Sequence, residues 1–226
     1  MFTENLQFVT TADGSKTIFN PIIGENYHSK HGALQESRHV FLKSGLQYFL
    51  EKSNQNTISI LEVGFGTGLN FLLSADYCTQ HETSLRYTGI EAYPLTPEMI
   101  AATGYEKYLN NQVYQSFLDC YTAAQCEVTR LNDNVTLNIV PCQLLQFNSS
   151  DSFDVLYFDA FAAIHQPEMW TDEALEHCCK YLKPGGVFVT YAITGNLKRT
   201  MKNLSFSIEK APGAPGKREM LRAIKN

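Results

Sequence analysis

The run Ile58-Ser59-Ile60-Leu61-Glu62-Val63-Gly64-Phe65-Gly66-Thr67-Gly68-Leu69-Asn70 decides the fold of this chain. It predicts a short apolar strand, a turn with glycine at every second position, and a helix that begins near Leu69. Glycine lets the backbone approach a ligand closely, and the first N–H groups of the helix point back at the turn. The spacing is neither the G-x-G-x-x-G pattern of dinucleotide sites nor the Gly-Lys-Ser/Thr ending of a phosphate loop. The turn therefore predicts a ligand site of another kind; the alternative is a glycine-rich turn that binds nothing.

A second strand ends in an acid at the distance that a nucleoside site needs. The run Leu85–Ile90 is followed by Glu91, about 20 residues past the glycine turn, where a carboxylate can accept both hydroxyls of a ribose. A lone glutamate at a strand end is otherwise simply solvated. A strand that ends in Glu-x-Gly-x-Gly-x-Gly resembles motif I of the S-adenosyl-L-methionine (SAM) methyltransferases of Rossmann-like fold. The resemblance implies SAM as the cofactor.

Length and composition indicate an ordinary globular protein. The 226 residues are 44% apolar and 18% charged, which suits one domain with a full core. No apolar run approaches the roughly 18 residues of a membrane span, and Met1–Asn5 does not begin a signal peptide. Six cysteines without C-x-x-C spacing favour free thiols in a reducing compartment. We expect a cytoplasmic protein that binds neither a membrane nor, since its histidines lack ligand spacing, a metal.

The charge is unevenly distributed along the chain. The formal net charge is −5, yet the segment from Asn196 onward holds eight Lys or Arg and two acidic residues. The rest of the chain holds 10 basic and 21 acidic residues. A basic segment of this kind attracts a phosphate backbone even on an acidic protein. The alternative is a solvated charged surface.

Strands and helices alternate from Ile58 to Ala192, which predicts an α/β fold. We expect a Rossmann-like class I SAM-dependent methyltransferase fold, with a mostly parallel seven-stranded sheet and helices on both faces. The last two strands, Phe206–Lys210 and Glu219–Ala223, should form an antiparallel pair. Before them, a helix over Pro167–Leu182 should stop at Lys183-Pro184-Gly185-Gly186, and a strand should begin at Val187.

The predicted domain organisation has two parts. Residues 1–56 form an N-terminal extension, whose helix over Ala33–Lys52 packs on the core as a lid. Residues 57–226 form the SAM-dependent methyltransferase domain of a single compact unit.

Asp159 is the predicted catalytic residue. It directly follows the apolar run Val155–Phe158, at the edge of the sheet where ligands of α/β proteins bind. An alkylammonium has a pKa near 10 and no free lone pair. A carboxylate can accept its N–H bonds and aim the freed lone pair at a sulfonium methyl group. The alternative role for Asp159 is to cap the turn that follows.

Longer phrases carry a closer resemblance. They include Gly64–Leu72 (GFGTGLNFL), Asp159-Ala160-Phe161 with Pro167-Glu168-x-Trp170, and Gly216–Leu221 (GKREML). In this order they resemble the methyltransferase part of the bifunctional tRNA enzyme MnmC and its stand-alone relative MnmD, from about residue 10 to 224. The resemblance implies methyl transfer from SAM to the primary amine of 5-aminomethyl-(2-thio)uridine at the wobble position of tRNA. The product is the 5-methylaminomethyl form.

The resemblance also implies the roles of individual residues. The residues that would hold SAM are Glu62, Gly64, Phe65, Gly66, Gly68, Asn70, Glu91, Ala92, Cys142, Gln143 and Asp159. Those that would contact the substrate are Tyr27, Ser29, Glu36 and Phe161 at the active site, and Lys198, Arg199, Lys217 and Arg218 at tRNA phosphates or partly in structural roles.

The chain departs from the family pattern at three places. Pro141-Cys142 stands where the family has an acid for the adenine amine, so backbone groups around Cys142 and Gln143 would hold adenine. Ala163 replaces a proline, and Lys198-Arg199 replaces paired arginines, which keeps the charge but loses one bidentate fork.

Further expectations concern partners. The flavin oxidoreductase half of MnmC has no counterpart in this sequence, so a separate flavin enzyme or another pathway would supply the aminomethyl substrate to a monomer. Two other functions stay open. One is an amine-directed transferase acting on a small molecule of the polyamine type. The other is a binding module that has lost catalysis, suggested by Cys142 but disfavoured by Glu62, Glu91 and Asp159. Trp170 either stacks on the uridine or belongs to the core.

Overall fold

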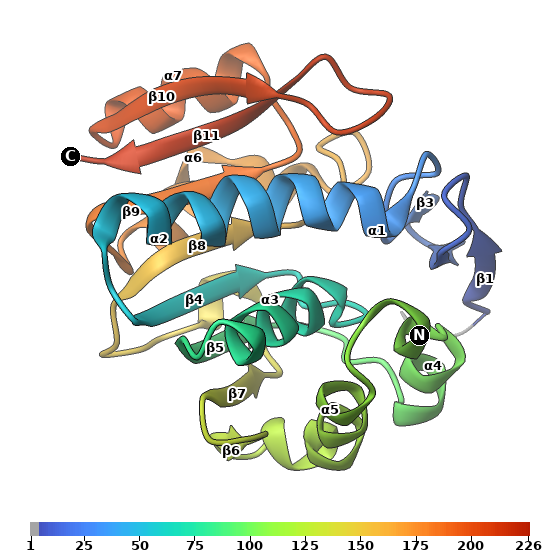
Figure 1. Cartoon of the computed structure of the whole chain (residues 1–226). Helices are drawn as coiled ribbons and strands as arrows, with labels where there is room; N and C mark the ends of the chain where they lie inside the picture. Colours follow the sequence, from blue (N-terminus) through green and yellow to red (C-terminus); the bar gives the residue numbers. More distant parts are fainter. Residues whose placement is uncertain (1–4) are drawn as a thin grey trace.

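The computed structural model describes residues 5–226, which form a large sheet between two layers of helices and a small sheet beside it (Figure 1). The strand order in the large sheet is β10-β11-β9-β8-β4-β5-β7-β6. Five strands are parallel and make up its centre: β4 (Thr57–Val63), β5 (Ser84–Ile90), β7 (Val135–Val140), β8 (Phe153–Phe158) and β9 (Leu182–Thr190). The α/β fold with a mostly parallel sheet is as predicted.

The two edges of the sheet are antiparallel. At one edge, β10 (Phe206–Pro212) pairs with β11 (Glu219–Lys225), and β11 pairs with β9. The predicted C-terminal antiparallel pair is therefore confirmed. At the other edge, the two-residue strand β6 (Thr129–Arg130) pairs with β7. This short strand gives the sheet eight strands, one more than the seven predicted.

Helices cover both faces of the sheet. One face carries α3 (Leu69–Gln80), α5 (Asn111–Ala124) and a continuous helical segment made of α1 (Ala33–Glu36), the π-helical η1 (Ser37–Gln47) and α2 (Tyr48–Ser53). The other face carries α6 (Asp172–Cys179) and α7 (Gly195–Asn203). Shorter turns are α4 (Pro97–Ala102), η2 (Tyr105–Tyr108), η3 (Leu144–Gln146) and η4 (Pro167–Trp170). In residues 5–226, none of the helices has the length and apolar character that crossing a bilayer requires.

The helical segment over residues 33–53 packs along its length on the sheet. Val40, Phe41 and Leu46 are buried in the core. At Gly45 the helix comes so close that an added Cβ would lie 2.8 Å from the Tyr157 ring. The segment is thus a core element, and its first turn reaches the carboxyl ends of the strands. The domain boundary predicted after residue 56 stays a prediction.

The small sheet lies beyond the carboxyl ends of the parallel strands (Figure 1). It consists of β1 (Gln7–Thr10), β2 (Lys16–Asn20) and β3 (Glu25–Asn26), all antiparallel. The turn between β2 and β3 and the residues after β3 therefore cover the carboxyl ends of the parallel strands, where ligands bind in this architecture.

Strand β9 begins earlier than predicted. The helix before it ends at Cys179, and Leu182 already pairs with Phe153, with an irregularity in the register before Val187. Lys183 is fixed in this first part of the strand because its ammonium lies 2.8 Å from Asp154 Oδ1. Tertiary contacts thus hold Lys183–Gly186 in the extended conformation of strand β9, although the composition of this segment alone predicts a turn.

Asp154 joins three strands at the end of the sheet opposite the ligand edge. Its Oδ2 accepts hydrogen bonds from the Ser59 N–H at 2.8 Å and the Ser59 hydroxyl at 2.6 Å, and its Oδ1 accepts the Lys183 ammonium. Asp154 is 5% exposed and Ser59 is 3% exposed. A buried donor that loses its acceptor bears the cost of its lost hydration.

Asp154→Ala should therefore destabilise the protein by about 2–4 kcal/mol, because it leaves the Ser59 N–H without an acceptor and Lys183 without its counter-ion. Urea unfolding followed by far-ultraviolet circular dichroism measures the change. Asp133→Ala is the control, since its ion pair with Arg130 is exposed and screened by water. Equal stability losses in the two variants would contradict this role of Asp154.

Candidate active site

A cavity of about 300 Å³ opens at the carboxyl ends of β4, β5 and β8. The glycine turn after β4 and the carboxylate after β8 both line it, so these two predicted parts of the site share one space. The predicted site residues that line the cavity are Tyr27, Gly64, Phe65, Gly66, Asn70, Glu91, Ala92, Cys142, Gln143, Asp159 and Phe161.

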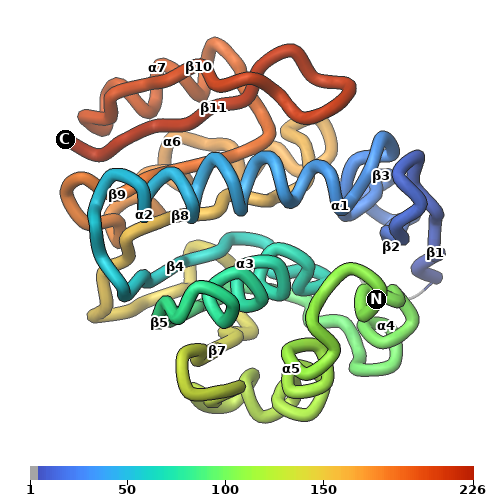
Figure 2. Tube along the Cα trace, viewed as in Figure 1, coloured from blue at the N-terminus to red at the C-terminus, as the bar shows by residue number. Residues whose placement is uncertain are grey.

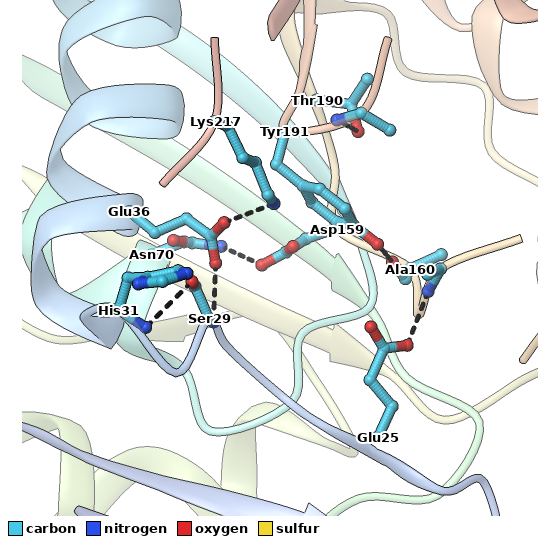
Figure 3. Close-up of polar contacts among 12 residues, drawn as sticks. Glu25, Ser29, His31, Glu36, Asn70, Asp159, Ala160, Thr190, Tyr191 and Lys217 are labelled. Atoms are coloured by element: carbon cyan, nitrogen blue, oxygen red, sulfur yellow. Dashed lines mark hydrogen bonds and ion pairs between the residues drawn. The ribbon is translucent and has the colours of Figure 1, made fainter. Parts of the chain in front are cut away.

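Asn70 connects the two ends of the site. From the first turn of α3, its Nδ2 donates a hydrogen bond to Glu62 Oε1 at 2.8 Å. It donates another to Asp159 Oδ2, also at 2.8 Å (Figure 3). Two carboxylate acceptors fix which end of the amide carries the nitrogen. The other end, Asn70 Oδ1, is buried and has no partner among the described residues. The amide thus aligns Asp159 and presents an acceptor that a ligand donor can satisfy.

The Asp159 carboxyl is tuned toward proton exchange near neutral pH. Burial, reinforced by the nearby Glu36 carboxylate, raises the pKa of Asp159 to about 8, although the Asn70 hydrogen bond and the Lys217 ammonium act in the opposite direction. The carboxyl end of β8 places it in the cavity, with its backbone N–H bonded to the Val63 carbonyl of β4. A carboxyl group with such a pKa can accept a proton from an amine and release it to solvent.

Glu62 lies behind the cavity wall and supports it. It is fully buried, and its second oxygen accepts the Tyr87 hydroxyl at 2.8 Å. Burial raises the pKa of Glu62 well above its ordinary range. Its observed contact with the site is the hydrogen bond to Asn70, so it holds Asn70 in place.

Glu91 binds the glycine turn. Its Oε2 accepts the Gly66 N–H at 2.8 Å and its Oε1 accepts the Tyr93 N–H at 3.0 Å. Each carboxylate oxygen keeps a further lone pair that can accept a hydrogen bond, and Glu91 lines the cavity. Gly66 packs against Tyr27, since a Cβ there would lie 2.9 Å from the Tyr27 ring. The acid, the turn and the aromatic residue therefore form one wall.

A second group of charges lies beside Asp159. Glu36, from α1, accepts the Ser29 N–H at 2.9 Å and the Lys217 ammonium at 2.8 Å (Figure 3). The Lys217 ammonium lies 3.8 Å from the centre of the Tyr191 ring, and the Tyr191 hydroxyl donates to the Ala160 carbonyl at 2.9 Å. Carboxylates, an aromatic face and a cation thus surround the space next to the predicted catalytic residue.

The sequence comparison agrees with this arrangement. Residues 104–226 match the family described as S-adenosyl-L-methionine-dependent methyltransferase. The chain belongs to this methyltransferase family. Its cofactor is accordingly S-adenosyl-L-methionine.

Among its curated relatives, the methyltransferase is 32% identical over 210 residues to the tRNA 5-methylaminomethyl-2-thiouridine biosynthesis bifunctional protein MnmC of Marinomonas sp. (strain MWYL1). The match covers 86% of this chain and 30% of that protein. The MnmC of Pseudomonas savastanoi pv. phaseolicola is also 32% identical, and that match covers 87% of this chain and 31% of the relative. The region that matches this chain therefore makes up about a third of the length of each of these relatives.

Solved structures share its fold. The crystal structure of MNMC2 from Aquifex aeolicus superposes with a TM-score of 0.78 at 21% identity, covering 97% of this chain and 70% of that one. The SAM-bound magnesium protoporphyrin IX methyltransferase of Synechocystis superposes with a TM-score of 0.53 at 13% identity. That match covers 86% of this chain and 81% of the other.

The residues of the methyltransferase suit the cofactor. The unpaired Asn70 Oδ1 could accept a hydrogen bond from an ammonium donor, Glu91 fits ribose hydroxyls, and the wall made of Cys142, Gln143, Leu144 and Leu145 could receive an adenine ring. Burial raises the pKa of the Cys142 thiol, so it stays protonated and uncharged. No cluster of three or more His, Cys, Asp or Glu within residues 5–226 could hold a metal ion, and all six cysteines are free.

Several predicted residues lie outside the cavity lining. Phe65 does line the cavity, although its ring also packs in an aromatic cluster with Phe71 and Phe117. Gly68 is the N-cap of α3, where an added Cβ would lie 2.9 Å from the Phe117 ring. Ser29, in the turn before α1, donates its N–H to Glu36 on α1, and both support the site from outside the cavity. Lys198 and Arg199 line a separate groove on α7 and β10. Lys217 is directed at Glu36, and Arg218 is exposed.

The sequence analysis did not predict that Tyr191 and Glu25 lie at the site. It also left two roles open for Trp170, and the structure decides between them. Tyr191 follows β9, and the rule that ligand residues follow parallel strands could have found it. Glu25 comes from β3 of the small sheet, where it accepts the Ala162 N–H at 2.8 Å, and no motif marks it. Trp170 is 8% exposed, donates to the Phe161 carbonyl at 2.7 Å and packs on Phe158, so it belongs to the core.

Proposed function

We propose that this methyltransferase converts 5-aminomethyl-(2-thio)uridine to 5-methylaminomethyl-(2-thio)uridine at the wobble position of tRNA. The observation that carries the proposal is Asp159, tuned by its surroundings and directed into the cavity that the glycine turn also lines. The names of the curated relatives, which refer to the biosynthesis of this tRNA nucleoside, support the choice of substrate.

The residues of the chain divide the work as follows. SAM, when bound, supplies a methyl group on a positively charged sulfur. Asp159 accepts the N–H of the incoming amine, and Asn70 holds the carboxylate in the direction of the cavity. Tyr27 and Phe161, whose rings meet edge to face at 5.1 Å, form an apolar side that excludes water around the amine. Most of the rate enhancement then comes from orientation and electrostatics.

A basic groove supports tRNA as the partner. Lys198, Arg199, Lys202 and Lys210 line a groove between α7 and β10 together with Gly195 and Ile208. Lys198 and Arg199 were predicted to meet phosphates, and the groove adds Lys202 and Lys210 to them. Positive charge in a concave surface suits a phosphate backbone. We propose that this groove carries the tRNA, that the enzyme acts as a monomer in the cytoplasm, and that a separate flavin enzyme or another pathway supplies the aminomethyl substrate.

The proposed reaction is tested with methyl-labelled SAM. The protein is incubated with bulk tRNA that carries aminomethyluridine, and the tRNA is digested to nucleosides for mass spectrometry. Label in methylaminomethyluridine is the expected result. A parallel incubation with polyamines tests the small-molecule alternative, and label in the polyamine without label in tRNA would reject the proposal.

The groove is tested by the double variant Lys198→Ala with Lys202→Ala. Two lost phosphate contacts should raise the KM for tRNA several-fold and reduce the slope of log affinity against log salt by about 1.5 to 2. The kcat at saturating tRNA should stay near that of the wild type, since neither side chain lines the cavity. Lys43→Ala with Lys107→Ala removes the same charge elsewhere and serves as the control. An equal effect on the salt slope in both double variants would contradict a specific groove.

A further inference from the structure

The Lys217 side chain turns inward from a segment that the sequence analysis associated with tRNA phosphates. Lys217 lies in the loop between β10 and β11, and its ammonium is 2.8 Å from Glu36 Oε1 and 3.8 Å from the centre of the Tyr191 ring (Figure 3). An ammonium over an aromatic face and against a nearly buried carboxylate has given up much of its hydration. Its position therefore reflects a fixed site and not a freely solvated lysine.

The loop that carries Lys217, drawn in red in Figure 2, contacts the N-terminal part of the chain, drawn in blue, through the Pro212 carbonyl and the Lys217 ammonium. His39 Nε2 lies 2.7 Å from the Pro212 carbonyl oxygen, and Gly216 packs so closely on the His31 ring that a Cβ would lie 2.4 Å from it. Within the loop, the Lys217 N–H donates to the Ala214 carbonyl at 2.8 Å. Both ends of the chain thus position the ammonium.

Asp159 is surrounded by groups of both signs. The titratable groups that interact with it come from every neighbouring element: Glu25 on β3, Glu36 on α1, Glu62 on β4, Tyr87 on β5, Tyr191 after β9 and Lys217 in the β10–β11 loop. Glu25 and Glu36 favour the protonated form of Asp159, whereas Lys217 favours the carboxylate. The lysine therefore opposes the acidic surroundings of the catalytic group.

We propose that Lys217 is a positioning residue of the acceptor site: Glu36 and the Tyr191 ring hold its ammonium where it balances the carboxylates around Asp159 and keeps Asp159 able to accept a proton. The inference rests on the proposed function. In the step that depends on it, an N–H bond of the substrate ammonium breaks, its electron pair stays on nitrogen as a lone pair, and the proton forms an O–H bond with the Asp159 carboxylate.

The direct test uses the cofactor-free protein and no tRNA. The titration of the Asp159 carboxyl carbon is followed by carbon-13 NMR, assigned by its absence in Asp159→Asn. Lys217→Met keeps an unbranched side chain on Tyr191 but removes the charge, and it should raise the titration midpoint by at least one pH unit. Lys217→Arg should keep the midpoint within half a pH unit of the wild type. Arg218→Met, an exposed neighbour, is the matched control and should leave the midpoint unchanged.

A second variant tests the same charge balance in the opposite direction. Glu36→Gln removes a negative charge beside Asp159, while its amide oxygen can still accept the Lys217 ammonium, so it should lower the midpoint. It keeps the proposal falsifiable if Lys217→Met does not fold. An unchanged midpoint in Lys217→Met, or no downward shift in Glu36→Gln, would overturn the proposal.

Kinetics then separate positioning from tRNA binding. If the tRNA reaction holds, the acidic limb of the profile of kcat/KM against pH should move upward in Lys217→Met by the same amount as the titration. If the midpoint rises by one pH unit, the kcat/KM at pH 7 should fall about tenfold. An unshifted profile combined with a reduced salt slope would assign Lys217 to a phosphate contact. A failed tRNA assay with the expected titration shifts would reject the proposed substrate and leave the role of Lys217 intact.

Discussion

Asp159→Asn should lower kcat about a thousandfold, within the range expected when a general base is lost, and at the same time raise thermal stability above pH 7. The amide can still accept the hydrogen bond from Asn70 that now reaches Asp159 Oδ2. It cannot accept a proton from the ammonium of the substrate. SAM affinity, measured by titration calorimetry, should stay within a few-fold of the wild type. A fully active variant would remove Asp159 from the catalytic role.

The gain in stability follows from the pKa of Asp159. Because folding raises this pKa from its ordinary value to about 8, the folded protein holds the proton more tightly than the unfolded chain. This contribution to stability is complete below the unfolded pKa near 4 and is lost as the pH rises through about 8. Asp159→Asn carries no such loss. The Tm difference in favour of the variant should therefore grow between pH 5 and pH 8.5.

Asp154→Ala is the counterpart of Asp159→Asn at the other end of β8. There the carboxylate accepts three hydrogen bonds from Ser59 and Lys183, so removing it should lower stability and leave kcat unchanged. Asp154→Ala should thus lower stability without changing kcat, whereas Asp159→Asn should lower kcat and raise stability above pH 7. A stability gain in Asp159→Asn that is the same at pH 5 and pH 8.5 would mean that its ionisation is not the cause.

Gly64→Ala should abolish measurable SAM binding and destabilise the fold by at least about 3 kcal/mol. Gly64 has φ +85, a backbone conformation that residues with a Cβ rarely adopt. An added Cβ would also lie 2.5 Å from the Asp159 carbonyl oxygen, which is backbone and cannot turn away. The clash would push the glycine turn away from β8, and a displacement of about 1 Å at a reacting centre can cost on the order of a hundredfold in rate.

Gly185→Ala separates the two causes. Gly185 has φ +77, close to that of Gly64, but nothing lies within 4 Å of a Cβ there. Its cost should be limited to the backbone conformation, about 1–2 kcal/mol, with SAM binding unchanged in calorimetry. If the two alanine variants lose equal stability and both bind SAM, the close approach between the glycine turn and β8 is not required for SAM binding.

The sequence by itself determined the order of the elements and the edge at which the site lies. The alternation of strands and helices predicts the parallel sheet, and the residues that follow strands, namely Gly64, Glu91 and Asp159, line the cavity or its wall. These predictions succeed because they depend on local periodicity and on one geometric rule: parallel strands end at a common edge. The C-terminal strand pair was predictable for the same local reason.

Tertiary structure alone decided which charges meet beside Asp159. Lys217 and Glu36 are 181 positions apart, and Glu25 reaches the site from a separate sheet. No spacing in the sequence distinguishes Lys217, which turns inward, from exposed Arg218. The β10–β11 loop directs Lys217 inward because it packs on residues near His31 and His39. Pairing between such distant segments depends on how the whole chain packs, and the pKa of the Asp159 carboxyl depends on that pairing.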